Sequence, residues 1–427
     1  MPARLLYSLL LYLLLPAILL RLCWRALRAP AYARRWGERF GHVAPLLGPG
    51  PGPVIWVHAV SVGETLAALP LIRRLQASQP RARLLVTTTT PTGSARVRAA
   101  LGESVAHCYA PYDFPHAVGR FLHRVQPALL IVMETELWPN LLDGCARRGI
   151  PVVLASARLS ARSAAGYGRV AALTRPMLAA LTRVAAQTRE DGERFLALGL
   201  APGKLQVIGN IKFDLELDAA LRARAHQLRA AWRGGVRSIW LAASTHEGED
   251  ELALAAHRQL LATRPDALLV LVPRHPERFD RVHALCMGQG FRTLRHSAGQ
   301  PPAIDTQVLL GDTMGELLAF CGAVDLVFVG GSLVPVGGHN LIEPAAWGKP
   351  VLSGPQVFNF VEAARLLEVG GGLRICADGA ALADAVAELL DQPGRCAALG
   401  AAAHAVAEAN RGALARLDAL IAPLCPR

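Results

Sequence analysis

The chain has 427 residues, which at about 150 residues per domain corresponds to roughly three domains or two large α/β domains. Apolar residues make up 52% and charged residues 18%, with 39 glycines and 29 prolines spread along the chain, so disordered, collagen-like and coiled-coil proteins are excluded. The formal net charge is +12, and residues 1–40 supply half of it through seven arginines against one glutamate. A basic region confined to one end favours contact with a membrane surface over a nucleic-acid groove.

The eight cysteines lie at least 20 residues apart, without a Cys-x-x-Cys pair. This spacing argues against zinc ribbons and thioredoxin-type chemistry. Cysteines scattered among apolar residues are typical of buried thiols in a reducing compartment.

An apolar segment near the N-terminus predicts a membrane-anchoring helix. Residues 5–20 carry no charge over 16 residues and are bounded by Arg4 and Arg21. One helix of that length spans about 24 Å, less than the roughly 30 Å hydrocarbon core, so snorkelling arginines could close the gap or the helix could lie partly embedded. A signal peptide fits less well because no small-x-small cleavage site follows, and an ordinary buried helix is the other alternative. Since the arginines follow the apolar run, the positive-inside rule keeps the rest of the chain in the cytoplasm.

Beyond this anchor, apolar runs of strand length alternate with helical stretches. The expected strands are residues 54–60, 84–88, 129–133, 152–155 and 184–187, then 238–242, 267–272, 308–310, 326–329 and 350–352. Such alternation predicts parallel, doubly wound sheets with right-handed crossovers. We therefore expect an α/β protein with an anchor at 1–28 and two Rossmann-like domains at 29–210 and 211–427, hinged near residues 205–215 and facing a cleft.

Common nucleotide and metal motifs are absent from the sequence. No Gly-x-Gly-x-x-Gly follows a strand, which disfavours a dinucleotide oxidoreductase. Gly348-Lys349 is followed by proline and is no P-loop, and His246-Glu247 lacks the second histidine of a zincin. No Asp-x-Asp pair is present to hold a metal–diphosphate, so we expect neither a catalytic metal nor a cofactor.

Three polar loops follow strands of the first half, where α/β folds bind ligands. In the segment 61–65, Glu64 sits at a predicted helix N-terminus, where it could serve as a general base or as an ordinary capping residue. The threonine run 87–93 could bind an anion or merely end a strand. Glu134 and Glu136 follow an apolar strand, and such neighbouring carboxylates are costly unless solvated, paired or employed.

Three more polar loops follow strands of the second half. They are residues 243–249, residues 273–278 with Arg274 as a possible phosphate ligand and His275 beside it, and the glycine-rich stretch 330–344. The glycines of that stretch permit close approach of a ligand to the backbone, and its polar end could contact a ribose and base.

Taken in order, these segments resemble those of a known family. They are VHAVSVGE (57–64), METELWPN (133–140), GNIKFD (209–214), VPRHPERF (272–279), GDTMGEL (311–317) and GGHN (337–340). A glycine-rich loop followed by Glu-Pro in a second Rossmann-like domain is similar to the donor site of GT-B glycosyltransferases. The whole set looks like that of the 3-deoxy-D-manno-octulosonic acid (Kdo) transferases, with the resemblance running from the anchor to about residue 365.

The resemblance implies a role for individual residues. Glu64 matches the family's general base, and Glu134 and Lys212 match residues that support the transition state. The matches to the CMP-binding segments are Pro273, Arg274 and His275, then Met314, Gly315 and Glu316, then Asn340, Leu341, Ile342 and Glu343.

The resemblance also implies the reaction and its place. It would be an inverting transfer of Kdo from CMP-Kdo to a lipid A precursor, at the cytoplasmic face of the bacterial inner membrane. The arginine-rich N-terminus would suit a phosphorylated headgroup in an anionic leaflet, and nucleic acid is not an expected partner. Two alternatives stay open: a membrane-associated GT-B enzyme with a UDP-sugar donor and a polyprenyl acceptor, and a non-enzymatic membrane adaptor.

Overall fold

The computed structural model describes residues 2–43, 52–233 and 237–426, and these form two compact units. Unit 1 comprises the chain up to Asp214 together with the segment from Arg411 onward, and unit 2 comprises Leu215–Asn410. The first crossing between units lies close to the expected boundary at residue 210. The second crossing, at residue 410, was not expected, and it returns the C-terminal segment to unit 1.

Unit 1 is built on a parallel sheet of seven strands within the described residues, in the order β3-β2-β1-β4-β5-β6-β7. The strands are β1 Val54–His58, β2 Arg83–Thr88, β3 Ala106–Tyr109, β4 Pro127–Met133, β5 Val152–Ala157, β6 Arg183–Ala186 and β7 Leu205–Val207. All neighbouring strands run parallel. The central strands are apolar on both faces because helices cover both, which is why they appear in the sequence as continuous apolar runs.

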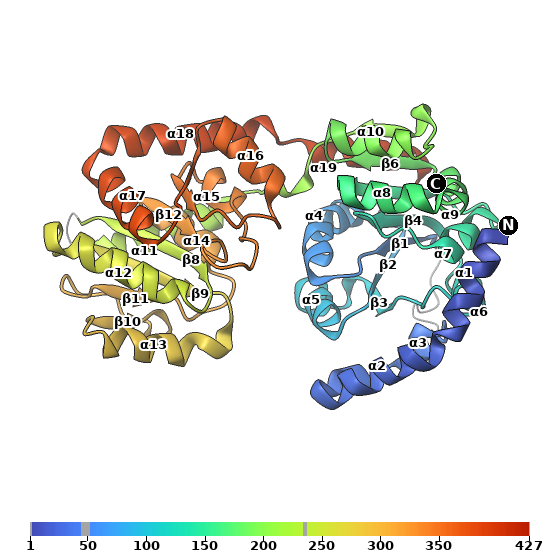
Figure 1. Cartoon of the computed structure of the whole chain (residues 1–427), viewed down its shortest axis with the longest axis horizontal. Coiled ribbons are helices and arrows are strands. Elements are labelled where there is room, and N and C mark those ends of the chain that lie inside the picture. Colours follow the sequence, from blue (N-terminus) through green and yellow to red (C-terminus); the bar gives the residue numbers. More distant parts are fainter. Residues whose placement is uncertain (1, 44–51, 234–236, 427) are drawn as a thin grey trace. The chain divides into compact units, whose positions relative to one another are not determined.

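Helices cover the two faces of this sheet (Figure 1). One face packs on α4 Val62–Ser78, α5 Pro91–Leu101 and α19 Ala413–Ile421. The other packs on α6 Pro115–Val125, α7 Pro139–Ala146, α9 Ala171–Ala180 and α10 Arg189–Ala197, with α8 Ala161–Arg169 beside them. The strand order reverses between β1 and β4, so the C-terminal ends of these two strands form the switch point where such folds bind ligands.

The helix α19 belongs to unit 1, contrary to the expected domain 211–427. Its buried residues Ala413, Leu417 and Ile421 are spaced by four and complete the core beside α4 and β6 (Figure 1). Asp214 caps the start of this segment by accepting the Gly412 and Leu414 N–H groups at 2.5 and 2.6 Å. The apolar face of a C-terminal helix does not reveal in the sequence which of two sheets it covers.

Unit 2 repeats the architecture with the order β10-β11-β9-β8-β12-β13-β14, again parallel throughout. The strands are β8 Ile239–Thr245, β9 Leu268–Pro273, β10 Thr293–Arg295, β11 Val308–Leu310, β12 Leu326–Val329, β13 Val351–Ser353 and β14 Leu373–Ile375. The helices are α11 Ala219–Arg233, α12 Glu249–Thr263, α13 Phe279–Gly288, α14 Leu317–Ala323, α15 Ile342–Ala346, α16 Val361–Val369, α17 Gly379–Asp391 and α18 Pro393–Ala409. Helices α12, α13 and α17 share one core with the sheet. The expectation of two parallel-sheet α/β domains is confirmed.

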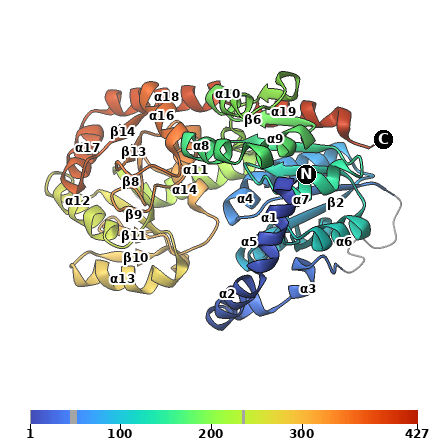
Figure 2. The same cartoon turned by 45° about the vertical axis from the view of Figure 1, so that its right-hand side comes forward.

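The N-terminal apolar segment forms two helices instead of the one expected. They are α1 Pro2–Leu13 and α2 Leu15–Arg28, bent by 48° where Pro16 interrupts the backbone hydrogen bonds, and α3 Trp36–Arg39 follows. Among the described residues no single helix is long and apolar enough to span a bilayer, although this bent pair passes the test of length and composition when taken together. Figure 2 shows α1 running along unit 1 beside α7 and α2 continuing past it.

Candidate active site

Glu64 lies in the first turn of α4, directly after β1. Its backbone N–H donates to the Ser61 hydroxyl at 3.2 Å, and that hydroxyl donates to the carboxylate at 2.8 Å. The other carboxylate oxygen accepts the Val60 N–H at 2.8 Å. This is a reciprocal cap of the helix N-terminus, so the capping role considered for Glu64 is real in this structure.

Capping does not account for the electrostatics of Glu64. The residue is only 7% exposed, and burial raises its pKa from 4.5 to about 7. Hydrogen bonds from Val60 and Ser61 oppose the shift, whereas the negative charges of Glu136 and Glu134 add to it. A carboxyl with a pKa near 7 is suited to general acid–base catalysis at neutral pH.

Glu134 follows β4 in a strained backbone conformation. Its φ is +52°, in the left-handed region that a residue with a side chain rarely adopts, and its N–H donates to the Ala155 carbonyl at 2.9 Å. Glu136 accepts the Trp138 indole N–H at 2.9 Å, and burial raises its pKa. The structure thus brings three carboxylates within electrostatic range of one another at the switch point of unit 1, and backbone strain at such a place is a feature of functional sites.

Lys212 lies in the same unit, within the short 3-10 helix Ile211–Phe213. The Asn210 side chain fixes that turn by accepting the Lys212 N–H at 3.0 Å. Ile211 and Phe213 on either side are buried. The turn therefore holds Lys212 on the first unit, although its expected place was the start of the second domain.

The threonine run 87–93 is occupied by contacts within unit 1. The Thr87 hydroxyl accepts the Trp56 indole N–H at 2.8 Å, Thr89 donates to the Val60 carbonyl at 2.9 Å, and Thr90 caps α5 by accepting the Gly93 N–H. Thr89 thereby supports the loop that holds Glu64, and all three hydroxyls have partners within the protein, which favours the structural role over the anion site that was considered.

The METELWPN segment also receives the N-terminal helix. Arg4 and Ser8 of α1 each donate to the Asn140 side chain at 3.1 Å, and Arg4 lies 3.1 Å from the Asp143 carboxylate. The polar residues of α1 therefore face unit 1, while its leucines at positions 5, 6, 9, 10 and 13 are between 49% and 67% exposed. This is the reverse of an ordinary surface helix.

In unit 2, the expected donor segments that contain Arg274 and Glu343 lie within electrostatic range of each other. Arg274 follows β9 and makes no ion pair with any residue that the structure describes. Asn340 accepts the Ile342 N–H at 3.1 Å and donates to Glu343 at 3.0 Å. Burial raises the pKa of Glu343, while the Asn340 hydrogen bond and the charge of Arg274 oppose that shift. The two segments are thus electrostatically coupled.

The segment 314–316 contributes in a different way. Glu316 accepts from Thr313 and from Arg224, both at 2.7 Å, and lies 3.2 Å from His296. Burial alone would raise its pKa, but these partners lower it below the ordinary value. Gly315 has φ +89°, and Met314 is 57% exposed. The carboxylate of Glu316 therefore fixes the loop, and the exposed part of the segment is its backbone and Met314.

The glycine-rich stretch is partly filled by a residue that the sequence analysis missed. The buried carboxylate of Glu249 accepts the N–H groups of Gly331, Ser332 and Leu333 at 2.6–2.9 Å, together with the His246 N–H at 2.9 Å. A Cβ added at Gly330 would lie 2.9 Å from the Ser244 carbonyl. Gly330 and Gly331 are needed for close packing within the protein, so the expectation that the glycines of this stretch approach a ligand does not hold for these two. The acidic residue at the start of α12 was the only signal in the sequence.

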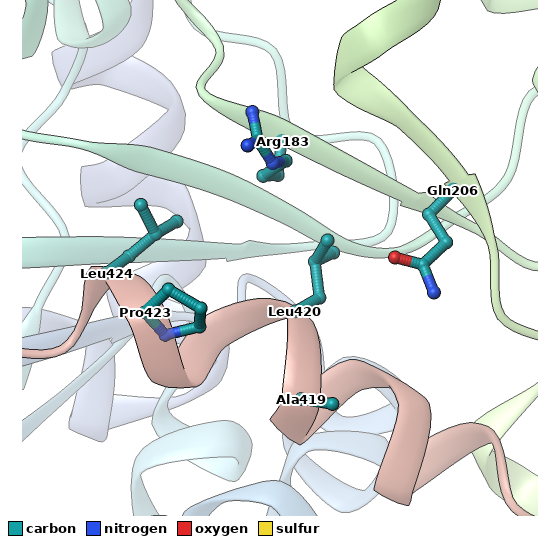
Figure 3. Close-up of a pocket in the computed structure, with 6 residues that line it drawn as sticks. All are labelled: Arg183, Gln206, Ala419, Leu420, Pro423 and Leu424. Carbon is teal, nitrogen blue, oxygen red and sulfur yellow. The ribbon is translucent and has the colours of Figure 1, made fainter.

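A pocket in unit 1 lies away from these residues (Figure 3). It is lined by Arg183, Gln206, Ala419, Leu420, Pro423 and Leu424, where β6 and β7 meet the C-terminal segment. None of the candidate site residues contributes to it.

Comparison of the sequence with those of known proteins identifies the family of this chain. Residues 34–215 match the model of the 3-deoxy-D-manno-octulosonic-acid transferase (kdotransferase) family. The chain is 46% identical over 425 residues to the 3-deoxy-D-manno-octulosonic acid transferase of Haemophilus influenzae, covering 99% of each chain. The chain belongs to the Kdo transferase family. The Kdo transferase of Bordetella pertussis is 42% identical, over 92% of this chain and 91% of its own, so the chain is a glycosyltransferase of this family over nearly its whole length.

Two solved structures are also similar to this chain. UDP-GlcNAc 2-epimerase from Neisseria meningitidis is 15% identical with a TM-score of 0.59, covering 87% of this chain and all of that one, and it shows the fold alone. The C-terminal CMP-Kdo binding domain of WaaA from Acinetobacter baumannii is 36% identical over 44% of this chain and 98% of its own, with a TM-score of 0.43.

Proposed function

We propose that this member of the Kdo transferase family transfers Kdo from CMP-Kdo to a lipid A precursor during lipopolysaccharide assembly, with inversion and without a catalytic metal. The observation that carries the proposal is the Glu64 carboxyl, which is buried at the switch point of unit 1 with a pKa of about 7. The donor and the acceptor are inferred from the membership of the chain in the Kdo transferase family.

In this reaction Glu64 acts as the general base. It removes the proton from an acceptor hydroxyl as that oxygen attacks the anomeric carbon of Kdo; the bond from that carbon to the CMP phosphate breaks, and CMP leaves with the bonding electrons. Val60 and Ser61 occupy one position on each carboxylate oxygen, and each oxygen has a second lone pair for the incoming hydroxyl. Glu134 and Lys212 support the transition state through opposite charges: Glu134 stabilises the positive charge that develops on the Kdo ring, and Lys212 stabilises an anionic group of the donor.

In unit 2 the donor is held by charge and by hydrogen bonds. Arg274 and His275 take an anionic group of CMP-Kdo, either the phosphate or the Kdo carboxylate, since Arg274 has no ion pair among the described residues. Asn340 and Glu343 bind the ribose, and the backbone around Gly315 contacts the nucleotide. Pro273, Leu341 and Ile342 shape the same segments.

The exposed leucines of α1 and the arginines that follow them fit a lipid acceptor. We propose that the helix pair α1–α2 anchors the enzyme on the anionic cytoplasmic leaflet of the inner membrane. Because Arg4 and Ser8 attach α1 to unit 1, this membrane contact lies on the unit that contains Glu64.

The direct test is to incubate purified full-length protein with CMP-Kdo and lipid A precursor and to weigh the products, with CMP and UDP as competitors. Glu64→Gln should lower turnover by about a hundred- to ten-thousandfold, because glutamine keeps the shape but cannot accept the proton. The matched control is Asp191→Asn. Asp191 caps α10 in the same way, since it accepts from the Thr188 hydroxyl at 2.8 Å and the Leu159 N–H at 2.7 Å.

Three outcomes of this test would contradict the proposal. Retention of more than about a tenth of wild-type turnover in Glu64→Gln would remove Glu64 as the base. Equal losses of turnover in Glu64→Gln and Asp191→Asn would show that the loss of a helix cap explains the lower turnover. Competition by UDP and not by CMP would favour the UDP-sugar alternative.

A further inference from the structure

His246 and His339 form a direct ring-to-ring hydrogen bond in unit 2. His246 comes directly after β8, and His339 lies in the glycine-rich stretch before α15. Their Nε2 atoms are 2.8 Å apart, and the rings are parallel to within 8°. Such a contact needs one proton between the two nitrogens, because two N–H groups would repel and two bare nitrogens would not bond.

The groups that face this pair are mostly cationic or able to become so. His275 stands edge-on to His246 at 5.4 Å, and Arg274 and Arg278 follow the same strand β9. Two carboxylates are near, but both are engaged. Asp250 pairs with Arg278, and Glu249 accepts four backbone N–H groups. Two more carboxylates offset this charge in part, since Glu277 lies 4.0 Å from His275 and Glu343 is within electrostatic range of Arg274. Among the described residues, neither His246 nor His339 forms an ion pair with a carboxylate.

Burial and the neighbouring positive charges together keep the pair uncharged. Burial, together with the positive charge of Arg274 and the neighbouring histidines, lowers the pKa of His339 to about 4. Burial also lowers the pKa of His246, with Glu249 opposing and with His275, Arg278 and Arg274 adding to the effect. In the ligand-free protein at neutral pH the pair thus holds a single shared proton and no net charge.

We propose that His246 and His339 belong to the anion site of unit 2 and take up one proton when a nucleotide phosphate binds beside Arg274. The proton comes from the solvent. An anion at this place offsets the neighbouring positive charges and favours the protonated pair, and the resulting imidazolium–imidazole pair retains its Nε2–Nε2 bond in a stronger, charge-assisted form. This inference rests on the proposed CMP-Kdo donor.

The added proton has a use in the proposed reaction. The phosphodiester of the donor carries one negative charge, whereas the released nucleotide monophosphate carries about two at neutral pH. A cation formed beside the leaving phosphate stabilises the charge that develops during bond breaking. His246 and His339 thereby complement Arg274, whose charge is fixed.

The test is calorimetric titration of the full-length protein with CMP at pH 7.5, in two buffers of different ionisation enthalpy, where CMP is itself almost fully ionised. We expect uptake of about half to one proton per CMP, and a CMP affinity that falls about three- to tenfold per pH unit between pH 7 and 8.5. In His246→Gln and in His339→Gln the uptake and the pH dependence should both disappear while CMP still binds. The control is His404→Gln, which alters an exposed histidine of α18 and should leave the uptake unchanged.

The outcomes of this titration distinguish a failure of the histidine pair from a failure of the proposed donor. CMP binding by wild type without proton uptake, or uptake that persists in both variants, overturns the role of the pair and leaves the proposed donor intact. If CMP does not bind wild-type protein, the proposed donor fails and this inference fails with it. If one variant does not fold, as judged by circular dichroism, the other variant and the wild-type titration still decide.

Discussion

Arg39 and Glu64 are connected by an unbroken chain of hydrogen bonds. The Arg39 guanidinium, 2% exposed, donates to the Thr89 carbonyl at 2.9 Å, and the Thr89 hydroxyl donates to the Val60 carbonyl at 2.9 Å. The Val60 N–H in turn donates to Glu64. The segment that joins the N-terminal helices to unit 1 is thereby coupled to the backbone that positions the proposed base.

The first prediction is the pH dependence of the reaction. Because burial raises the pKa of Glu64 to about 7 and a base acts only when ionised, kcat/KM for the acceptor at saturating CMP-Kdo should rise about tenfold per pH unit below pH 7 and level off above it. The measurement is a profile of kcat/KM from pH 5.5 to 8.5. A profile that is flat between pH 5.5 and 7 would contradict this assignment.

Replacement of Ser61 should move that profile. In Ser61→Ala the carboxylate loses a hydrogen bond that lowers its pKa, so the rise in kcat/KM should shift to higher pH. The loss of the cap should also lower the free energy of unfolding by about 0.5–2 kcal/mol. Ser160→Ala is the matched control, since Ser160 caps α8 by accepting the Ser163 N–H at 3.1 Å; it should show a similar loss of stability with an unchanged pH profile.

Removal of donor-site charges should weaken nucleotide binding. Arg274→Ala and Glu343→Ala should each reduce CMP affinity about ten- to a hundredfold, as expected for a lost charge-assisted hydrogen bond of about 1.5–3 kcal/mol. Calorimetry with CMP provides the measurement. Arg281→Ala removes an arginine of α13 that is 66% exposed and paired with Glu247, and it should leave the affinity unchanged. Normal affinity in both donor-site variants would place the nucleotide elsewhere.

The C-terminal helix should be essential to unit 1. Leu417→Ala removes a fully buried side chain from the core beside α4, which should cost about 2–5 kcal/mol of unfolding free energy. Leu420→Ala, at a partly buried position of the same helix, should cost clearly less. Urea unfolding followed by circular dichroism measures both. Equal small effects would show that α19 does not stabilise this core.

The strands that the sequence predicted and those it missed differ in their place in the sheets. All ten predicted strands are present, and the four that were missed, β3, β7, β10 and β14, are the edges of the two sheets. A central strand is buried on both faces and leaves a continuous apolar run. An edge strand such as Thr293–Arg295 is half-exposed and only three residues long, so its pairing depends on a neighbour distant in sequence.

The candidate site was also predictable only in part. The position of Glu64 after a strand and at a helix start could be inferred from the pattern alone, and the structure agrees. The contact between His246 and His339 could not, because it joins two loops 93 residues apart. Nor could the occupation of the glycine-rich stretch by Glu249, since composition does not reveal whether a loop's N–H groups bind a ligand or the protein itself.

The return of α19 to unit 1 has a consequence for synthesis on the ribosome. Domains generally fold in the order in which they emerge, at about 5–20 residues per second. Here the helix that completes the first core is translated only after all of Leu215–Asn410. Unit 2 can therefore reach its native state before unit 1. Until α19 has been translated, part of one apolar face of the first sheet stays exposed, and a chaperone could bind there.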